Sequence, residues 1–353
     1  MKIALITDTH FGARNDSLPF NDYFYKFWEE IFFPLIDKKK IDTIIHLGDT
    51  MDRRKFVSYK IANDFRTRFL RPILDRDIHF HILIGNHDTF YKNTNDINSV
   101  EELIGDKSDR VWYYTESKTV EIGGTSIHLV PWINSENYYD SMKKIKETNA
   151  SICMGHLEIS GFEMHKGHYS EIGHPKEIFD KFNTVFSGHF HKKSDDGKIF
   201  YLGSPYQMTW SDDNCPKGFH IFDTETNEIE RIINPYTIFQ KIYYDDSTTD
   251  YSKVDVSQYR EKFIKLIVVN KKDIYKFDMF VDRLLSEQTH EVKIVEDFSE
   301  LDASNVSDDI AENTQDTTTL LEKYIDELDV DLNKERLKNT MKGLYLEACD
   351  MEI

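Results

Sequence analysis

Five short segments of this chain each place potential metal ligands directly after an apolar, strand-like run. In order, they are Asp8–His10, Gly48–Asp49, Gly85–Asp88, Gly155–His156 and Gly188–His191. Side chains that follow the carboxyl ends of strands in an α/β sheet gather at one edge of that sheet. A glycine before a ligand permits a sharp turn and a close backbone approach. The segments therefore favour a fold in which several separate strands end around one site.

The candidate ligands are carboxylates, imidazoles and one amide, with no thiolate. They are Asp8, His10, Asp49, Asn86, His156, His189 and His191. This mixture suits Mn²⁺, Fe²⁺ or Zn²⁺ and argues against copper or an iron–sulfur cluster. The set is too large for one ion with an open position but suits two ions that share a bridging carboxylate. Such a pair activates water and holds phosphoryl oxygens, which predicts a hydrolase acting on a phosphate ester.

The spacing within the segments adds detail to this hypothesis. In an extended segment, residues i and i+2 point to the same face, so Asp8 and His10 should face one pocket, as should His189 and His191. His87 follows a candidate ligand and has Asp88 beside it, so it is a candidate to protonate the leaving oxygen or stabilise the pentacoordinate state. A single segment would be weak evidence, because an aspartate after a strand is more often a helix cap. All five segments occur in this chain, in order, which a chance match would not produce.

The first part of the chain alternates buried strands with helices. Nearly continuous apolar runs at Lys2–Thr7, Asp42–Leu47 and His79–Ile84 are typical of strands that are buried on both faces. Asn21–Lys39 and Ser58–Asp75 between them have helical spacing of apolar residues. This βαβαβ pattern predicts right-handed crossovers and a largely parallel sheet.

The rest of the chain divides into four predicted parts. Further strands are expected at Val111–Tyr114, Thr119–Ile122, Ser126–Val130, Ser151–Gly155, Asn183–Gly188, Lys198–Leu202, Gly218–Asp223 and Glu228–Ile233, with a helix at Tyr138–Thr148. They complete an α/β domain of two sheets flanked by helices over residues 1–240. A small α/β capping domain follows at 241–298, then a polar, acidic linker at 299–318 and a helical tail at 319–353.

Charge and composition set limits on partners and location. The net charge is −19, but residues 296–331 hold thirteen acidic residues and only Lys323, a net of −12, so the remainder carries −7. No basic stripe for nucleic acid is visible. No apolar run reaches the ~20 residues that a membrane span needs, and the three cysteines have no paired spacing. We expect a soluble, cytoplasmic protein of a reducing compartment.

The tail has two stretches with amphipathic helical spacing. We expect it to dock on a partner through Leu320, Tyr324, Leu328, Leu337, Met341, Leu344 and Tyr345. Docking back onto the catalytic domain is the alternative.

Together the five segments resemble the calcineurin-like metallophosphoesterase signature, over residues 1–210. Within that superfamily, the chain is similar to the SbcD nucleases, relatives of the eukaryotic meiotic-recombination-eleven nuclease, and to their bacteriophage members. The similarity rests on Tyr201–Pro205 after the last histidine motif, on the cap and tail, and on His156–Phe162, Ser187–His191 and Phe222–Thr226.

The resemblance implies a metallophosphoesterase sandwich and an Mn²⁺-dependent DNA nuclease with two metal ions. It implies that Asp8, His10, Asp49 and His191 hold one ion and that Asp49, Asn86, His156 and His189 hold the other. It further implies that His87 is catalytic and oriented by Asp88. Ser204 would lie near the DNA backbone, with Tyr206 and Trp210 at the rim of the site.

Partners are also implied by the resemblance. Family members dimerise through early helices, for which Asn21–Lys39 and Ser58–Asp75 are candidates, although ordinary packing of these helices is an equal alternative. Their tail helices bind an SMC-like coiled-coil ATPase of the SbcC type, in an assembly of two copies of each subunit that processes DNA ends in recombination, repair and replication.

Two competing functions are open at this point. A phosphatase or phosphodiesterase of the same superfamily would act on a substrate other than DNA. Gly48–Arg53 is similar to the phosphoprotein phosphatase motif, but Arg54 stands where that motif has glycine. A scaffold without metals is the second alternative, and the complete ligand set argues against it.

Overall fold

The computed structural model describes residues 1–105, 109–165, 168–171 and 173–296, and, in the C-terminal segment, Ile325, Lys334, Leu337, Lys338 and Met341. The predicted acidic linker and the predicted partner-binding residues Leu320, Tyr324, Leu328, Leu344 and Tyr345 lie outside the described residues. Leu337 and Met341 are described and are half-buried. Within the described part of the chain, no helix has the length and apolar character that a membrane span requires.

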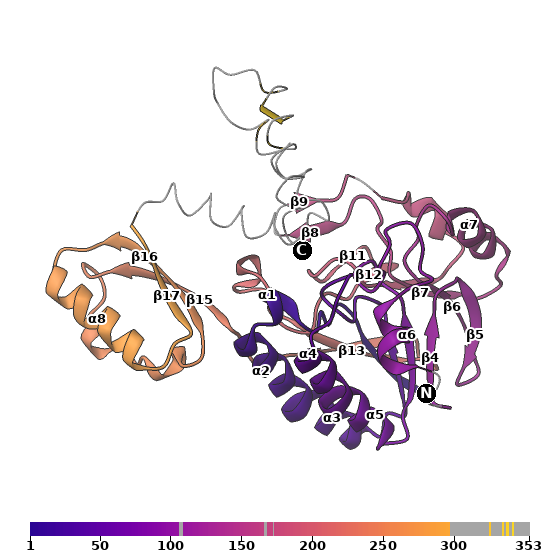
Figure 1. The fold of residues 1–353 in the computed structure, drawn as a ribbon, viewed down its shortest axis with the longest axis horizontal. Coiled ribbons are helices and arrows are strands. Elements are labelled where there is room, and N and C mark those ends of the chain that lie inside the picture. The colour runs from indigo at the N-terminus through magenta and orange to yellow at the C-terminus, as the bar shows by residue number, and fades with distance from the viewer. Residues whose placement is uncertain are drawn as a thin grey trace.

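Two six-stranded sheets form the centre of the molecule (Figure 1). The first has the order β14 (Glu228–Ile233), β13 (Gly218–Asp223), β1 (Lys2–Ile6), β2 (Thr43–His46), β3 (His79–Leu83) and β4 (Val111–Tyr114). The second has the order β11 (Ser194–Asp195), β12 (Ile199–Tyr201), β10 (Thr184–Ser187), β7 (Ile152–Gly155), β6 (Thr125–Val130) and β5 (Lys118–Ile122). Strands β1 to β4 are parallel to one another, as are β6, β7, β10 and β12.

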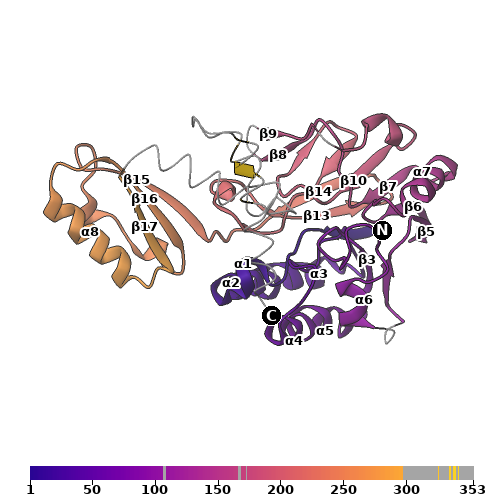
Figure 2. The same ribbon diagram turned by 45° about the horizontal axis from the view of Figure 1, so that its top comes forward.

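Helices cover the outer faces, and Figure 2 shows the early helices gathered in one layer. That layer consists of α1 (Ala13–Asp16), α2 (Leu18–Phe27), α3 (Phe33–Lys39), α4 (Tyr59–Asp64) and α5 (Arg71–Leu74), with π-helical turns at Trp28–Phe32 and Phe65–Leu70. Elsewhere lie α6 (Ser99–Ile104), α7 (Tyr138–Glu147) and a small hairpin of β8 (Glu163–His165) and β9 (His168–Tyr169). The prediction of two sheets flanked by helices is confirmed.

Alternation along β1 explains its continuous hydrophobicity. Ile3 and Leu5 belong to the core between the sheets, whereas Ala4 and Ile6 belong to the core between the first sheet and the helices. Both faces of the strand are therefore buried, so neither can be polar.

Most aromatic side chains of the early helices face the core rather than solvent. Phe24, Trp28 and Phe69 are buried in the cluster between helices and sheet. The apolar face of these helices therefore packs on the sheet, which agrees with the alternative of ordinary packing. The main exception is Tyr59 at the start of α4, which is 95% exposed.

The cap is a separate α/β module that projects from the sandwich (Figure 1). Its parallel strands are β15 (Phe239–Asp245), β16 (Phe263–Asn270) and β17 (Glu291–Val295), covered by α8 (Ile274–Ser286). Tyr244, Leu266 and Phe280 are part of its own core. Because β15 begins at Phe239, the first cap strand starts slightly before the predicted boundary at residue 241.

Candidate metal centre

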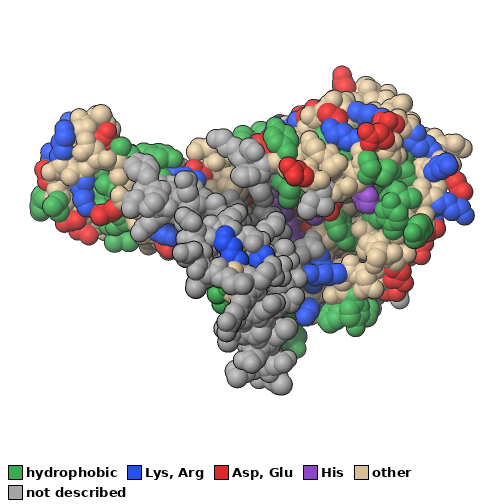
Figure 3. Space-filling view, turned by 90° about the horizontal axis from the view of Figure 1, so that it is seen from above, with side chains coloured by type: hydrophobic (Ala, Val, Ile, Leu, Met, Phe, Trp, Pro, Cys, Tyr) green, Lys and Arg blue, Asp and Glu red, His purple; other side chains and the backbone are tan. Residues whose placement is uncertain are grey.

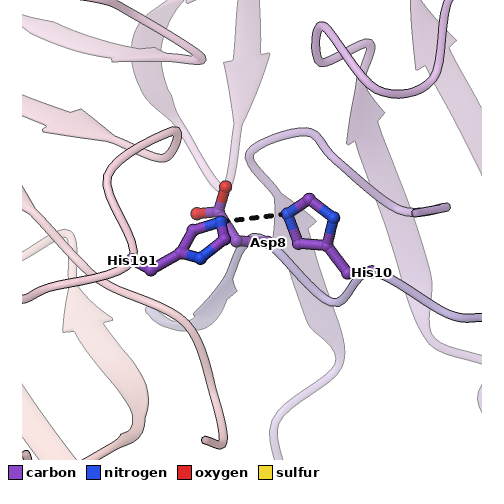
Figure 4. Close-up of side chains that lie close together, drawn as sticks. All are labelled: Asp8, His10 and His191. Carbon is purple, nitrogen blue, oxygen red and sulfur yellow. Dashed lines mark hydrogen bonds between the residues drawn. The ribbon is translucent and has the colours of Figure 1, made fainter. Parts of the chain in front are cut away.

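The five ligand-bearing loops meet where parallel strands of both sheets end. The loops after β1, β2 and β3 come from the first sheet, and the loops after β7 and β10 come from the second. Figure 4 shows Asp8, His10 and His191 directed toward one point. Their donor atoms are grouped within 4.8 Å, and the Nε2 atoms of His10 and His191 lie 3.1 Å apart.

A second group of donors lies beside the first. It contains Asp49, His156 and His189, again within 4.8 Å. The Asn86 side-chain oxygen lies 2.9 Å from His156 Nε2 and 3.0 Å from His189 Nδ1. All candidate ligands of the second predicted ion are therefore near neighbours.

Asp49 joins the two groups. Its Oδ2 lies 3.3 Å from His156 Nε2 and 3.7 Å from His10 Nε2. A carboxylate between two clusters of imidazoles is the arrangement that a bridging ligand requires.

These separations fit divalent ions. With metal–ligand bonds of about 2.0–2.2 Å, neighbouring ligands of one ion lie roughly 3 Å apart. Asp8, Asp49, Asn86 and His156 are buried, whereas His87, His189 and His191 are partly exposed and form the open side. Figure 3 shows histidine side chains recessed below the surrounding surface. The donor set therefore suits a pair of ions that a substrate can reach.

The backbone of the ligand loops is not extended as expected. Asp8, His10, Asp49 and His189 have positive φ angles of 51°, 41°, 55° and 84°. The i and i+2 reasoning for Asp8 and His10 is therefore wrong, although both side chains converge as predicted. Left-handed conformations of residues other than glycine are strained and persist only where the surroundings hold them. Here, the Asp8 amide donates to the Gly48 carbonyl at 3.0 Å and the His10 amide to the Asp49 carbonyl at 3.1 Å.

Two glycines allow the loops to approach each other. A Cβ at Gly85 would lie 2.2 Å from the Asp49 backbone nitrogen, and one at Gly188 would lie 2.0 Å from Thr7 Oγ1. No side chain fits at those distances. These glycines serve close approach, as the sequence predicts.

The electrostatics of the centre favour protonated imidazoles in the absence of metal. Burial alone would lower the pKa of His10, but Asp52, Asp49 and Asp8 outweigh it and raise that pKa to about 9. At His156, burial is likewise outweighed, mainly by Asp49, and the pKa again rises to about 9. Asp49 keeps its charge, because nearby histidines outweigh its burial and hold its pKa well below the usual value.

Metal binding is therefore expected to release protons. With pKa values of about 9, both imidazoles are expected to be charged at neutral pH in the metal-free protein, and each must be neutral to bind an ion. We expect release of about two protons at pH 7.5 and a metal affinity that rises with pH until about 9. Calorimetric titration of Mn²⁺ in buffers of different ionisation enthalpy measures this release; heats that do not depend on the buffer would contradict it.

His87 is held by Asp52, not by Asp88. His87 Nδ1 lies 2.6 Å from the Asp52 carbonyl oxygen and donates to it, which leaves Nε2 without that bond. His87 is partly exposed, and with His10 and Asp49 it forms a third group of donors within 4.8 Å. Asp88 instead accepts backbone N–H bonds from Gly85, Thr50 and Met51 at 2.9–3.0 Å. The predicted orienting role of Asp88 is thus corrected: it ties the Asp49 loop to the Asn86 loop.

The predicted rim residues lie in the interior. Tyr206 is fully buried, stacks on Phe24 at 3.7 Å between ring centroids and donates to the Thr9 carbonyl. Trp210 is 8% exposed, and its ring packs 4.7 Å from that of Phe239. Ser204 is 1% exposed, and its amide donates to the His191 carbonyl at 3.1 Å. This burial contradicts direct substrate contact by these side chains. Tyr206 and Ser204 instead bond to backbone carbonyls of the metal loops, whereas Trp210 packs on Phe239.

Three residues near the ligands were missed by sequence reasoning. The Asp52 carboxylate lies 3.4 Å from His10 Nδ1, Glu158 lies 3.9 Å from His189 Nε2, and the Trp132 ring lies 5.1 Å from the His189 ring. Carboxylates behind ligand imidazoles fix the orientation and basicity of the ring. Asp52 could have been found from the sequence, because it is the second aspartate of the Gly48–Arg53 motif. Trp132 belongs to none of the five segments, so no sequence signal pointed to it.

Comparison with known proteins agrees with this geometry. Residues 1–193 match the model of the calcineurin-like phosphoesterase family. The chain is 32% identical over 355 residues to exonuclease subunit 1 of Enterobacteria phage T4, covering 99% of both chains. This similarity confirms the resemblance to the bacteriophage nuclease group.

Two solved structures have more distant similarity. One is an archaeal phosphodiesterase, 16% identical, with a TM-score of 0.35 over 66% of this chain and 100% of the other. The other is GAP50, the anchor in the inner membrane complex of Plasmodium, 12% identical, with a TM-score of 0.40 over 67% of this chain and 90% of the other. Scores this low support no statement about fold or function.

Proposed function

The chain belongs to the calcineurin-like phosphoesterase family, and on this premise we propose that it is an Mn²⁺-dependent DNA nuclease. The observation that carries the proposal is the pair of ligand groups joined by Asp49, in a chain that aligns from end to end with a phage exonuclease subunit. Two bound ions would supply Lewis-acid activation of water and neutralise charge on the phosphoryl oxygens.

The chain's own residues would divide the remaining work. Asp8, His10 and His191 would hold one ion, Asn86, His156 and His189 the other, and Asp49 both. The half-exposed His87, fixed by its Nδ1–H bond to the Asp52 carbonyl, would exchange a proton with the substrate through Nε2. The neighbouring Glu158 would keep His189 in its ligand orientation.

One comparison of substrates tests the function. The metal-free full chain is mixed with labelled single- and double-stranded DNA, p-nitrophenyl phosphate or bis-p-nitrophenyl phosphate, with and without Mn²⁺. We expect DNA and the diester to be hydrolysed only with Mn²⁺, and the monoester far more slowly. An Asp49→Ala protein purified identically controls for contaminating nucleases. Hydrolysis of the monoester without hydrolysis of DNA would favour the phosphatase alternative.

We also propose that the chain acts as a homodimer with an SMC-like ATPase of the SbcC type, which would supply much of the DNA affinity. The support is the similarity to a protein named as an exonuclease subunit, together with the apolar spacing of the tail. Exposed Tyr59, Phe56 and Leu18 near the starts of α4 and α2 are candidates for the dimer contact.

Deleting residues 318–353 is expected to abolish association with the ATPase and to leave basal hydrolysis within about twofold, because every candidate ligand precedes residue 192. Co-purification of tagged subunits and the diester assay measure the two effects. Retained association would show that the tail is not the binding element.

A further inference from the structure

Trp132 occupies a rigidly held position beside the metal centre. It lies just beyond β6, and its amide donates to the Ile84 carbonyl at 2.8 Å, immediately before the Gly85–Asp88 loop. Its carbonyl accepts bonds from the Asn95 and Asn137 side chains, both at 3.0 Å. Because both backbone polar groups are bonded, the backbone that carries the side chain is held in place.

The indole ring lies beside the second ligand group. Its centroid lies 5.1 Å from that of His189 and 6.0 Å from that of His156. Trp132 is half-buried, and it is a member of none of the hydrophobic clusters found among the described residues. The ring lies against candidate metal-ligand histidines and is not part of a core. It is therefore available to stack on an aromatic ligand.

The negative charge near Trp132 favours a neutral group of the ligand at this position. Glu158, 31% exposed, lies 3.9 Å from Nε2 of His189, the histidine whose ring also lies beside Trp132. A carboxylate repels a phosphate but accepts hydrogen bonds from the N–H groups of a base. A phosphate held at the metal centre would therefore place its nucleoside, not a neighbouring phosphate, against Trp132 and Glu158.

We propose that Trp132 stacks on an unpaired nucleobase adjacent to the scissile phosphate, so that the chain hydrolyses single-stranded or frayed DNA ends. This inference rests on the proposed nuclease function and assigns a base subsite to it. A base in a duplex is stacked on its neighbours and cannot present its face to the indole, whereas an unpaired base can.

Removal of one base at a time from the substrate tests the proposal. Single-stranded oligonucleotides carry an abasic residue at the first, second or third position from either end, and the rate of the first cut is measured with Mn²⁺. One position should lower the kcat/KM of the wild-type enzyme by about 5- to 150-fold, the range for loss of one base–aromatic stack. Because this part uses the unaltered protein, misfolding cannot produce the result.

The variants complete a double-mutant cycle. Trp132→Ala should lower kcat/KM on intact DNA by a similar factor, and the abasic residue at the sensitive position should then cause no further loss. Trp132→Phe should restore most of the kcat/KM on intact DNA and most of the sensitivity to the abasic residue. Trp112→Ala is the matched control, since Trp112 is also partly exposed and stacks on two histidines, His79 and His81, that are not candidate ligands. It should behave as wild type.

The outcomes separate the two proposals. Equal sensitivity to the abasic residue in wild type and Trp132→Ala would overturn the base subsite, because a merely structural tryptophan lowers all rates alike. Failure of the wild-type chain to hydrolyse both DNA and bis-p-nitrophenyl phosphate with Mn²⁺ would overturn the nuclease function itself.

Discussion

Replacing Asp49 by alanine is expected to reduce metal binding from two ions to at most one and to lower phosphodiester hydrolysis by about 1000-fold. Asp49 is the carboxylate shared by both ligand groups, with Oδ2 within 3.7 Å of His10 Nε2 and of His156 Nε2. Its Oδ1 also accepts the His87 amide at 2.8 Å. No other described carboxylate spans both groups.

Metal content after dialysis and kcat/KM on bis-p-nitrophenyl phosphate measure this effect. Asp64→Asn is a matched control, because Asp64 is also a buried aspartate but pairs with Asn21 and Lys60 on the helical layer. It should bind the full complement of ions. Two tightly bound ions and wild-type activity in Asp49→Ala would contradict the bridging role.

Replacing His87 by alanine is expected to lower DNA hydrolysis by about 10²- to 10⁴-fold while both ions remain bound, the usual range for loss of a general acid or base. The His87 backbone amide, which alanine keeps, donates to Asp49, and a ring nitrogen of His87 lies within 4.8 Å of donor atoms of His10 and Asp49. Burial lowers the pKa of His87, so its imidazole is largely neutral near pH 7.

The separation of chemistry from metal binding is the decisive readout for His87. Mn²⁺ affinity and thermal stability should stay near the wild-type values while kcat falls. His79→Ala, which removes an exposed histidine on β3, should change neither. If His87→Ala lost an ion together with its activity, His87 would be a ligand and not a proton carrier.

The buried strands could be predicted from the sequence because a strand that is buried on both faces must be apolar at nearly every position. Lys2–Thr7 corresponds to β1, and such a run must be covered on both faces. Strand β15 was missed because its sequence, with Gln240 and Lys241 among apolar residues, has partly exposed positions and gives a weaker pattern. The candidate metal ligands could be predicted because each is a carboxylate, imidazole or amide that directly follows a predicted strand.

Other features depend on contacts distant in the chain. The left-handed backbone at Asp8 and Asp49 opposes local preference and is held by bonds between separate loops. Tyr206 was misassigned because an aromatic residue after a motif suits a rim or a core equally, and Phe24, which decides the matter, is far away in sequence. Asp88 adjoins His87 in sequence, yet its oxygens are taken by backbone amides.

The most direct test of the account is a crystal structure of the chain soaked in Mn²⁺, with anomalous scattering recorded near the manganese edge. We expect two peaks about 3.5–4 Å apart, one contacting Asp8, His10 and His191, the other Asn86, His156 and His189, and both contacting Asp49. A single peak away from Asp49, or no manganese among these side chains, would contradict the two-metal centre.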